Sequence, residues 1–377
     1  MPLVFILAFR NLFHDRLRLI ATVIGIVFSI VLVTVQMGLY LGFGLMVTTM
    51  IDHASADLWV MPRGTKCFED PSLLNTRERY RALSIDGVAE AIPVVIGFAD
   101  WRMPSGEMTP VFVIGSDLRS AGLQPWNLVE GRIEALSSPK AIAIDRTYFD
   151  RLGVSGVGAT AEIRSQPVRV AAVTDGIRSF TTTPFVFVDV NRARAYTGIP
   201  PGKATYLFIR LSPDADLDQV RDQLMSNIAD VEVLTPAEFR ERSRKFWLFG
   251  TGAGAALFAG ALLGVIVGTV IVAQTLYSST KEHLNEFATL RAMGSSRRYI
   301  YNVIVCQALL NAVIGFSIAA LIGRAIVQLT AATALPIVIT PGLIVGLFLL
   351  TVVMCIGSSV AAIVQVTRID PAIVFTR

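Results

Sequence analysis

The chain alternates between long apolar runs and one long polar segment. A charge-free stretch of 33 residues, Leu19 to Ile51, is followed by a polar segment of 194 residues, Asp52 to Lys245. Three more uncharged runs then follow: Phe246 to Thr280, Tyr299 to Gly323 and Ala325 to Thr367. About 20 helical residues cross the hydrocarbon of a bilayer, so each run is long enough to span it. A bilayer offers the backbone no hydrogen-bond partners, and each span is therefore expected to be a helix.

This spacing predicts an α-helical membrane protein with four transmembrane helices and an α+β extracytoplasmic domain inserted between the first and second. A cleaved signal peptide is the competing interpretation of the first run, but a signal core is only about 7 to 15 residues long. We expect these parts: an amphipathic arm (1–18), the first span (19–51), an α+β domain (52–235) with a β-rich insert (116–203), a helical stalk with the second span (236–279), a cytoplasmic helix (280–298), the third span (299–323), an outer loop (324–341), the fourth span (342–367) and a tail (368–377).

Charge gives the orientation of the spans. Apolar residues make up 53% of the chain and charged residues only 16%, as expected for a protein with several spans. The arm, the loop between the second and third spans, and the tail together hold nine basic residues against four acids (Arg10, Arg16, Arg18, Lys281, Arg291, Arg297, Arg298, Arg368 and Arg377; Asp15, Glu282, Glu286 and Asp370). By the positive-inside rule these parts and both termini are cytoplasmic, and the large domain is outside.

The outer domain is predicted to be a mixture of helices and strands. Two βαβ units, one near each end of the domain, could form one split layer, with 116–203 inserted as a small β-rich subdomain. Cys67 is alone in the domain, so its own core must hold it together. The expected strands are 58–61, 92–103, 110–114, 141–144, 159–164, 168–173, 184–188, 205–211 and 231–234, and the expected helices are 77–83 and 217–228.

A helix start marks the return to the membrane. Thr235 supplies a capping hydroxyl, Pro236 occupies the first helical position and Glu238 the third. Glu238 and Arg242 are then spaced to pair along the helix. We expect a rigid polar helix that runs straight into the second span. The alternative is a broken helix with a flexible joint, because Gly250, Gly252 and Gly254 follow soon after.

The sequence offers no catalytic or metal-binding pattern. Its three histidines, His14, His53 and His283, lie in separate parts of the chain, and no GxxxxGK[ST] loop is present. Apart from Arg324, at the outer end of the third span, no Asp, Glu, Lys or Arg lies inside a span, which disfavours a proton- or ion-coupled transporter. We therefore expect no catalytic residue, no metal site and no cofactor in this chain.

Small residues recur every four positions along the second span, at Gly260, Gly264 and Gly268. Such spacing lets helices approach closely. The contact could lie within the subunit, or it could form a dimer interface; both interpretations stay open at this point.

The cytoplasmic stretch from Thr280 to Gly294 has the pattern of a short amphipathic helix with a glycine at its C-terminal end. A solvated loop is the alternative. Within it, Glu286 to Gly294 reads E-F-A-T-L-R-A-M-G, which resembles the E-[IF]-[GA]-x-[LM]-[RK]-A-[LM]-G segment of ABC transporter permeases of the MacB/FtsX type (type VII). Lys281-Glu282-His283 departs from the Thr-x-Arg-x-x-Glu opening common in that family.

Further matches to this family are A-F-R-N-L at 8–12, L-V-E-G-R at 128–132 and D-P-A at 370–372. The resemblance covers essentially the whole chain, and DevC-like exporter permeases, which lack a fused ATPase, are the nearest branch. It implies a bacterial inner-membrane homodimer bound to two copies of a separate ABC ATPase, which would bind ATP and Mg²⁺. It also implies a periplasmic membrane-fusion adaptor and an outer-membrane channel as partners.

In this family the cytoplasmic helix couples to the ATPase, and rigid helices carry the ATP-driven movement to the outer domain, a mechanism called mechanotransmission. The resemblance therefore assigns the coupling role to Lys281, Glu282, Glu286, Thr289, Leu290, Arg291, Ala292, Met293 and Gly294. The expected cargo is lipid-like, a glycolipid or a peptide. The alternatives are an FtsX-like signalling subunit that regulates a periplasmic cell-wall hydrolase, and a lipoprotein-releasing permease.

Overall fold

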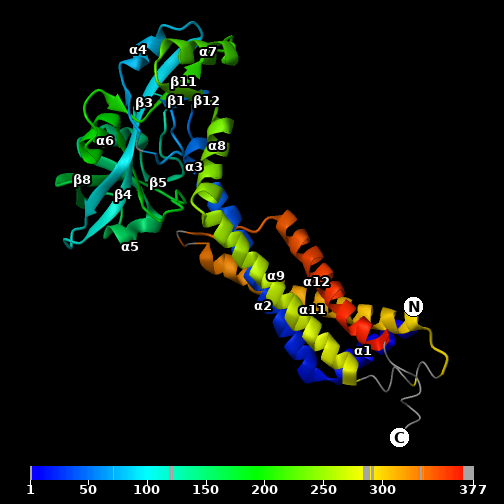
Figure 1. The fold of residues 1–377 in the computed structure, drawn as a ribbon. Helices are drawn as coiled ribbons and strands as arrows, with labels where there is room; N and C mark the ends of the chain where they lie inside the picture. Colours follow the sequence, from blue (N-terminus) through cyan, green and yellow to red (C-terminus); the bar gives the residue numbers. More distant parts are fainter. Residues whose placement is uncertain are drawn as a thin grey trace. The chain divides into compact units, whose positions relative to one another are not determined.

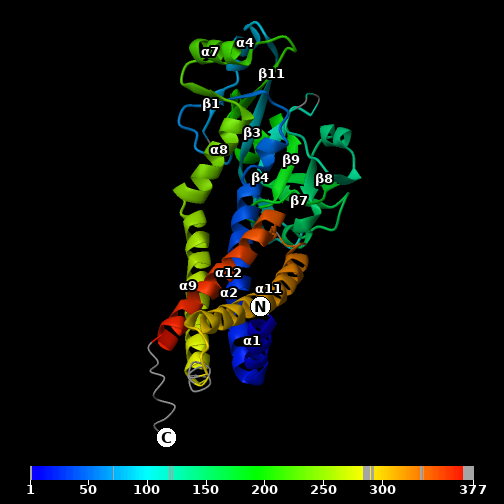
Figure 2. The ribbon, with the colours of Figure 1, turned by 90° about the vertical axis from the view of Figure 1, so that its right-hand side faces the viewer.

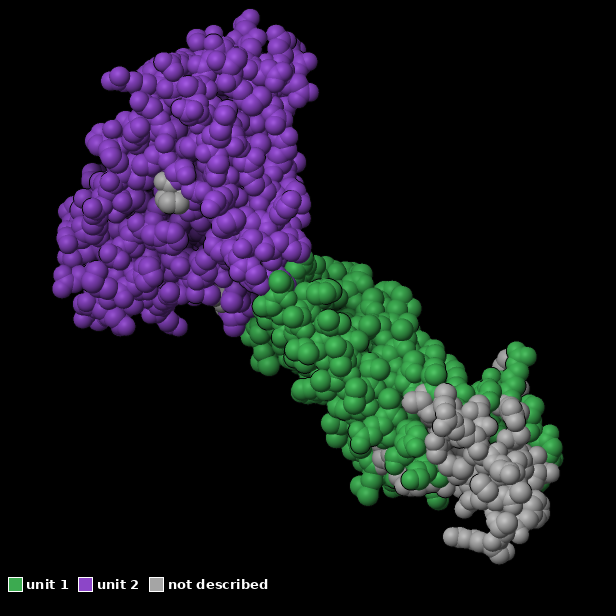
Figure 3. Space-filling model, viewed as in Figure 1, with its two compact units in different colours: residues 1–41, 255–331, 336–377 green, residues 42–254, 332–335 purple. Residues whose placement is uncertain are grey.

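The structure, a computed structural model, describes residues 2–70, 72–118, 120, 122–282, 289, 293–331, 333 and 335–367. The chain divides into two compact units, coloured in Figure 3. We call residues 1–41, 255–331 and 336–377 the membrane unit, and residues 42–254 with 332–335 the sheet unit. Each unit is described by itself.

Four helices in the described part of the chain are long and apolar enough to cross a membrane. They follow the four uncharged runs, because such runs can satisfy their backbone groups only as helices in lipid. The third of them continues seven residues past Gly323, so the start of the predicted outer loop at 324 is wrong. The helices of the unit are α1 (Pro2–His14), α2 (Arg16–Met46), α9 (Ala253–Glu282), α11 (Arg297–Thr330) and α12 (Pro341–Thr367).

Small polar groups join the spans within the membrane unit. The Ser29 hydroxyl of α2 donates a 2.7 Å hydrogen bond to the backbone oxygen of Gly264 in α9. The Ser358 hydroxyl of α12 likewise donates a hydrogen bond to the backbone oxygen of Thr269 in α9, at 3.0 Å. A cluster of buried apolar side chains from α2, α9, α11 and α12, among them Ile26 and Val272, fills the space between the helices.

The sheet unit is built on one mixed sheet. In the described residues it has ten strands, nine of which follow the order β12-β1-β11-β3-β4-β9-β6-β8-β5, while β7 pairs with β3 and β8. β2 and β10 form a separate two-stranded ladder. The strands are β1 (Leu58–Pro62), β2 (Leu74–Asn75), β3 (Val88–Arg102), β4 (Met108–Ser116), β5 (Leu128–Gly131), β6 (Ala141–Asp145), β7 (Thr160–Ile163), β8 (Gln166–Thr174), β9 (Phe185–Asp189), β10 (Lys203–Ala204), β11 (Tyr206–Leu211) and β12 (Val231–Leu234).

The 15-residue strand β3 joins the two halves of the sheet. Its first part pairs with β11, up to Val94 opposite Tyr206, and its second part pairs with β4 from Val95 onward, opposite Gly115. The parallel pairing of β4 with β9 then continues the sheet into the insert (Figures 1 and 2). The predicted insert at 116–203 is β-rich, with strands β5 to β9, but it is not a subdomain of its own, because these strands hydrogen-bond into the same sheet.

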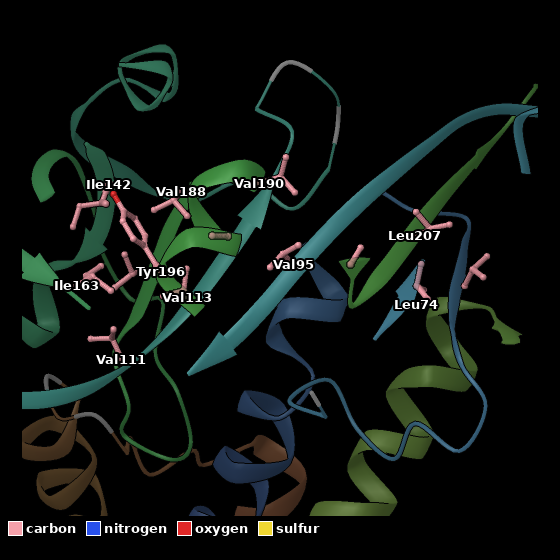
Figure 4. Close-up of a cluster of buried hydrophobic side chains, with 14 of the residues drawn as sticks. Leu74, Val95, Val111, Val113, Ile142, Ile163, Val188, Val190, Tyr196 and Leu207 are labelled. Atoms are coloured by element: carbon pink, nitrogen blue, oxygen red, sulfur yellow. The ribbon is translucent and has the colours of Figure 1, made fainter. Parts of the chain in front are cut away.

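Both faces of this sheet carry buried side chains. Successive side chains of a strand point to opposite faces, and consecutive residues of the central strands are buried. On β4, for example, Val111 and Val113 belong to one cluster, shown in part in Figure 4, and Phe112 and Ile114 belong to the cluster on the other face. The helical segments of the unit are α3 (Thr49–Asp52), α4 (Glu78–Leu83), η1 (Ile133–Ser137), η2 (Arg146–Tyr148), α5 (Phe149–Leu152), α6 (Val190–Thr197), α7 (Leu217–Asn227), α8 (Pro236–Lys245) and η3 (Phe246–Gly250).

Candidate functional site: helix α8 and its attachments to the sheet

Helix α8 begins with the predicted capping box. The Thr235 hydroxyl accepts a hydrogen bond from the Glu238 backbone N–H (3.2 Å), and the Glu238 carboxylate accepts one from the Thr235 backbone N–H (2.9 Å). Two free N–H groups of the first turn are thereby satisfied. Since Thr235 directly follows Leu234 at the end of β12, the cap fixes the helix to the edge of the sheet.

One aromatic side chain seats α8 on the sheet. Phe239 is fully buried, and its ring lies 5.0 Å from that of Trp59 and 5.7 Å from that of Tyr206. Trp59 and Tyr206 come from the neighbouring strands β1 and β11, and they project from the same face. Burial of a phenylalanine side chain contributes about 2 to 3 kcal/mol, so this contact is the strongest attachment of the helix.

Three ion pairs surround this apolar contact. Arg240 lies 2.6 Å from Asp52, the last residue of α3, and Arg242 pairs with Glu232 of β12. Burial favours a high pKa for Glu232, but hydrogen bonds from the Arg242 side chain and the Gly64 backbone outweigh it and lower the pKa. The Glu238–Arg242 pair predicted from the sequence is wrong, because Glu238 pairs with Arg221 of α7 at 2.9 Å instead.

The last turn of this helical segment, η3, is a π-helical turn that carries Trp247. The Trp247 indole N–H donates a 2.9 Å hydrogen bond to the Glu69 carboxylate. Burial raises the pKa of Glu69 from 4.5 to about 7, against the opposing effect of that hydrogen bond. The Tyr206 hydroxyl holds the Glu69 loop by donating to the backbone oxygen of Phe68, at 2.7 Å.

An aromatic row continues from Trp247. Its ring lies 4.5 Å from that of Phe180, which in turn lies 5.0 Å from that of Phe43 near the end of α2. Edge-to-face aromatic pairs of this kind contribute about 0.5 to 1.5 kcal/mol each beyond their burial. The C-terminal end of α2 and the start of η3, which are about 200 residues apart in the chain, are therefore tied to the same loop of the sheet unit.

The path from α8 into the second span is not a continuous α-helix. After η3 the chain turns at Gly252, whose φ of +78° suits glycine, and α9 starts at Ala253. The prediction of a rigid helix that runs straight into the membrane is wrong, and the broken helix is what the structure shows. A side chain at Gly254 would collide with the backbone of Leu248, so this glycine permits the tight turn.

Comparison with known proteins assigns the chain to a family. Residues 19–226 match the model of the MacB-like periplasmic core domain, and residues 257–371 match that of the FtsX-like permease C-terminal domain. This chain belongs to the MacB/FtsX-type family of ABC transporter permeases. The first match covers the first span and most of the sheet unit, and the second covers the helices that follow.

Similar proteins cover almost the whole permease. An ABC transporter permease of Mycobacterium tuberculosis is 26% identical over 396 residues, which are 98% of either chain. An ABC transporter permease of Mycobacterium bovis is 25% identical over 385 residues, again 98% of either chain. Among solved structures, the periplasmic region of MacB from Actinobacillus actinomycetemcomitans aligns with 51% of this chain and 94% of that one, with a TM-score of 0.39 and 10% identity.

Four of the nine coupling residues expected in this permease, Glu286, Leu290, Arg291 and Ala292, lie outside the described residues. Lys281 and Glu282 form the end of α9, and Met293 is exposed. The Met293 backbone N–H donates a helix-type hydrogen bond to the Thr289 oxygen, at 3.0 Å, and Gly294 has a φ of +94°. The role of these residues stays a prediction.

The glycines of the second span face α2 of the same subunit. A Cβ atom at Gly268 would meet the Ser29 side chain, one at Gly264 would lie 3.2 Å from Leu32, and one at Gly260 would lie 2.8 Å from Gln36. Of the two interpretations left open, packing within the subunit is therefore the one that the structure shows for these glycines. A dimer interface, if it uses α9, uses another face of the helix.

Sequence reasoning missed Glu69, Trp247 and Phe239 as a joint set. Phe239 follows the recognised capping residues by one position, but nothing local indicates that Trp59 and Tyr206 form its seat. Trp247 and Glu69 are 178 residues apart, so no periodicity links them. The one local signal was Trp247 itself, because an indole N–H at the start of an apolar run usually needs a hydrogen-bond partner.

Proposed function

We propose that this permease is the membrane subunit of an exporter. It would convert motion of a separate cytoplasmic ATPase into movement of its periplasmic domain, and thereby expel a lipid-like, glycolipid or peptide substrate. In this proposal the permease forms a homodimer in the bacterial inner membrane, the ATPase binds ATP and Mg²⁺, and a membrane-fusion adaptor and an outer-membrane channel continue the path.

One observation carries the proposal: α8 is attached to the sheet by a cap, a buried ring and ion pairs, and its chain continues directly into the second span. A helix fixed on this many sides moves together with its sheet. The second span ends at Glu282, at the start of the segment whose sequence resembles the coupling helix of the family. A displacement of that end has a short covalent route to the sheet.

The break at Gly252 supports a joint in that route. Gly252 has a positive φ, and a Cβ atom placed on it would meet no other atom within 4 Å. Glycine has the widest range of backbone angles, which suits a joint at this position. The adjacent π-helical turn, η3, also supports a functional role for this segment, since such turns are frequent at functional sites. In the proposal, the Trp247–Glu69 contact decides how far the joint bends.

The test uses two classes of variant in the full-length permease, reconstituted with its ATPase in liposomes. Glu286→Arg and Leu290→Asp should abolish ATPase binding, because they alter the proposed coupling segment. Trp247→Ala should leave ATPase binding and ATP hydrolysis intact but reduce export, because it acts beyond that segment. Tyr80→Ala, a similarly large truncation at an exposed position of α4, is the matched control and should behave like the wild type.

Two outcomes would contradict the proposal: unchanged export by both coupling variants, or export that persists without the ATPase. A wild-type complex that hydrolyses ATP and binds a periplasmic hydrolase, yet moves no substrate, would favour the signalling alternative instead. Lipoprotein release would appear as transfer of an acylated protein out of the liposome.

A further inference from the structure

A groove in the membrane unit lies between α2, α11 and the start of α12. It encloses about 470 Å³, which is within the usual range for small-ligand sites. Its walls are mostly apolar: Ile30 comes from α2, Phe316 and Ala320 come from α11, and Ile344 and Leu347 come from α12. Such walls suit an alkyl chain.

One end of the groove is different. Arg324 and Gln328 line it, one helical turn apart on α11, and Arg324 is exposed. Arg324 is also the only charged residue in the sequence between Arg298 and Arg368. The guanidinium group thus lies beside an apolar groove and has no charged neighbour along its own part of the chain.

In the sequence, no acid of the membrane unit lies near Arg324. The four acids of the unit, Asp15, Glu282, Glu286 and Asp370, adjoin the opposite ends of the spans, and the long uncharged runs on either side of Arg324 contain none. An unpaired arginine near hydrocarbon is costly, and it is stabilised by pairing or by reaching the headgroup layer. An anion from outside the unit would therefore stabilise Arg324.

The surroundings indicate where that anion comes from. Next to the groove, Leu321 on α11 is 69% exposed and Val345 on α12 is 59% exposed. In a helix unit that spans a membrane, side chains of this kind face hydrocarbon. A ligand that enters from this side is an amphiphile of the bilayer and not a solute of the aqueous phase.

We propose that this groove is a binding site for an anionic membrane phospholipid. One acyl chain lies along Ile30, Phe316 and Leu347, and the phosphate accepts hydrogen bonds from the Arg324 guanidinium, which matches phosphate oxygens two at a time. Gln328 is within the same groove wall and can donate to the headgroup. The site belongs to the membrane unit itself, so it does not depend on which substrate the permease exports.

The test measures lipid binding to the full-length permease in detergent by native mass spectrometry. Phosphatidylglycerol is titrated in parallel with phosphatidylcholine of the same chains. We expect one phosphatidylglycerol per chain to be retained preferentially, and Arg324→Gln to weaken it about tenfold or more, since a hydrogen bond to a charged group is lost. Arg298→Gln, which removes a charge at the other end of the same helix, is the matched control and should keep the preference.

Further variants separate the two parts of the site. Ala320→Trp should fill the groove and abolish binding of both lipids at this site, whereas Val313→Trp, at an exposed position of α11 outside the groove, should not. Arg324→Lys keeps the charge and should retain part of the preference, provided that gel filtration shows an intact protein. Equal phosphatidylglycerol binding by wild type and Arg324→Gln, or displacement of the lipid by millimolar inorganic phosphate, would overturn the proposal.

Discussion

The indole nitrogen of Trp247 lies 2.9 Å from a carboxylate oxygen of Glu69, and this contact joins the turn before the second span to a loop on the sheet. Burial holds the pKa of Glu69 at about 7, compared with 4.5 for an ordinary glutamate. Between pH 4.5 and about 7, the folded state therefore keeps a proton on Glu69 that the unfolded state has already released. Neighbouring Cys67 has a pKa of about 12, raised by burial, so it stays a neutral thiol over this range.

The first prediction concerns stability against pH. Because the folded-state pKa of Glu69 is raised, its contribution is fully present below about pH 4.5 and is lost as the pH rises through about 7. The loss amounts to at most about 1.4 kcal/mol per pH unit for one proton. Glu69→Gln should flatten this part of the profile, measured as the thermal midpoint of the full-length protein in detergent from pH 5 to pH 8. Glu107→Gln, an exposed carboxyl on the β3–β4 turn, should leave the slope unchanged.

A second prediction concerns the hydrogen bond itself. The Trp247 N–H stabilises the ionised carboxylate and so lowers the pKa of Glu69 relative to burial alone. Trp247→Phe should therefore move the pH-dependent loss of stability to higher pH. The same thermal measurements, followed by the fluorescence of the remaining tryptophans, report it. An unchanged profile would show that the indole does not act on this carboxyl.

The third prediction compares two adjacent positions of α8. Phe239→Ala should lower the free energy of unfolding by about 3 to 5 kcal/mol, because it removes a fully buried ring. Arg240→Ala should cost less than about 1 kcal/mol, because the side chains of the Arg240–Asp52 pair are 39% and 35% exposed. Denaturant unfolding of both variants gives the comparison, and similar losses would contradict the ranking of these attachments.

The fourth prediction concerns the glycines of α9. Gly268→Val should destabilise the membrane unit by about 1 to 3 kcal/mol, because the new side chain collides with Ser29 and pushes α2 and α9 apart. Gly346→Val on α12 has no neighbour within 4 Å and should be tolerated. Thermal unfolding in detergent distinguishes the two. Equal midpoints would mean that α9 and α2 do not pack closely at this point.

Local signals in the sequence predicted most elements of the sheet unit. Val231–Leu234 is a strand with the predicted bounds, and the capping box at Thr235 is present. Helix α6 was missed, although Asp189 caps it and Gly198, with a φ of +75°, ends it. Its sequence is polar over much of its length, so hydrophobic periodicity gave no indication of a helix.

The remaining features depend on contacts between segments that are far apart in the sequence. The sequence suggested a small β-rich subdomain at 116–203 because Gly, Pro and Ser bound its short strands, and nothing local indicates that β9 pairs with β4 in parallel. A broken helix, suggested by Gly250, Gly252 and Gly254, was one of two interpretations, and nothing local indicates that Trp247 reaches Glu69, 178 residues away. Tertiary contacts therefore decided the features on which the site depends.

The shared strand β3 has a consequence for engineering this protein. Removal of 116–203 would leave the edge of β4 open, with Phe112 and Ile114 no longer covered by β9. An open, apolar edge of this kind recruits other chains and leads to aggregation. Shortened versions that are meant to stay free of aggregates should keep the whole sheet. An affinity tag or a fluorescent reporter belongs on the β3–β4 turn near Gly106, where no ladder is interrupted.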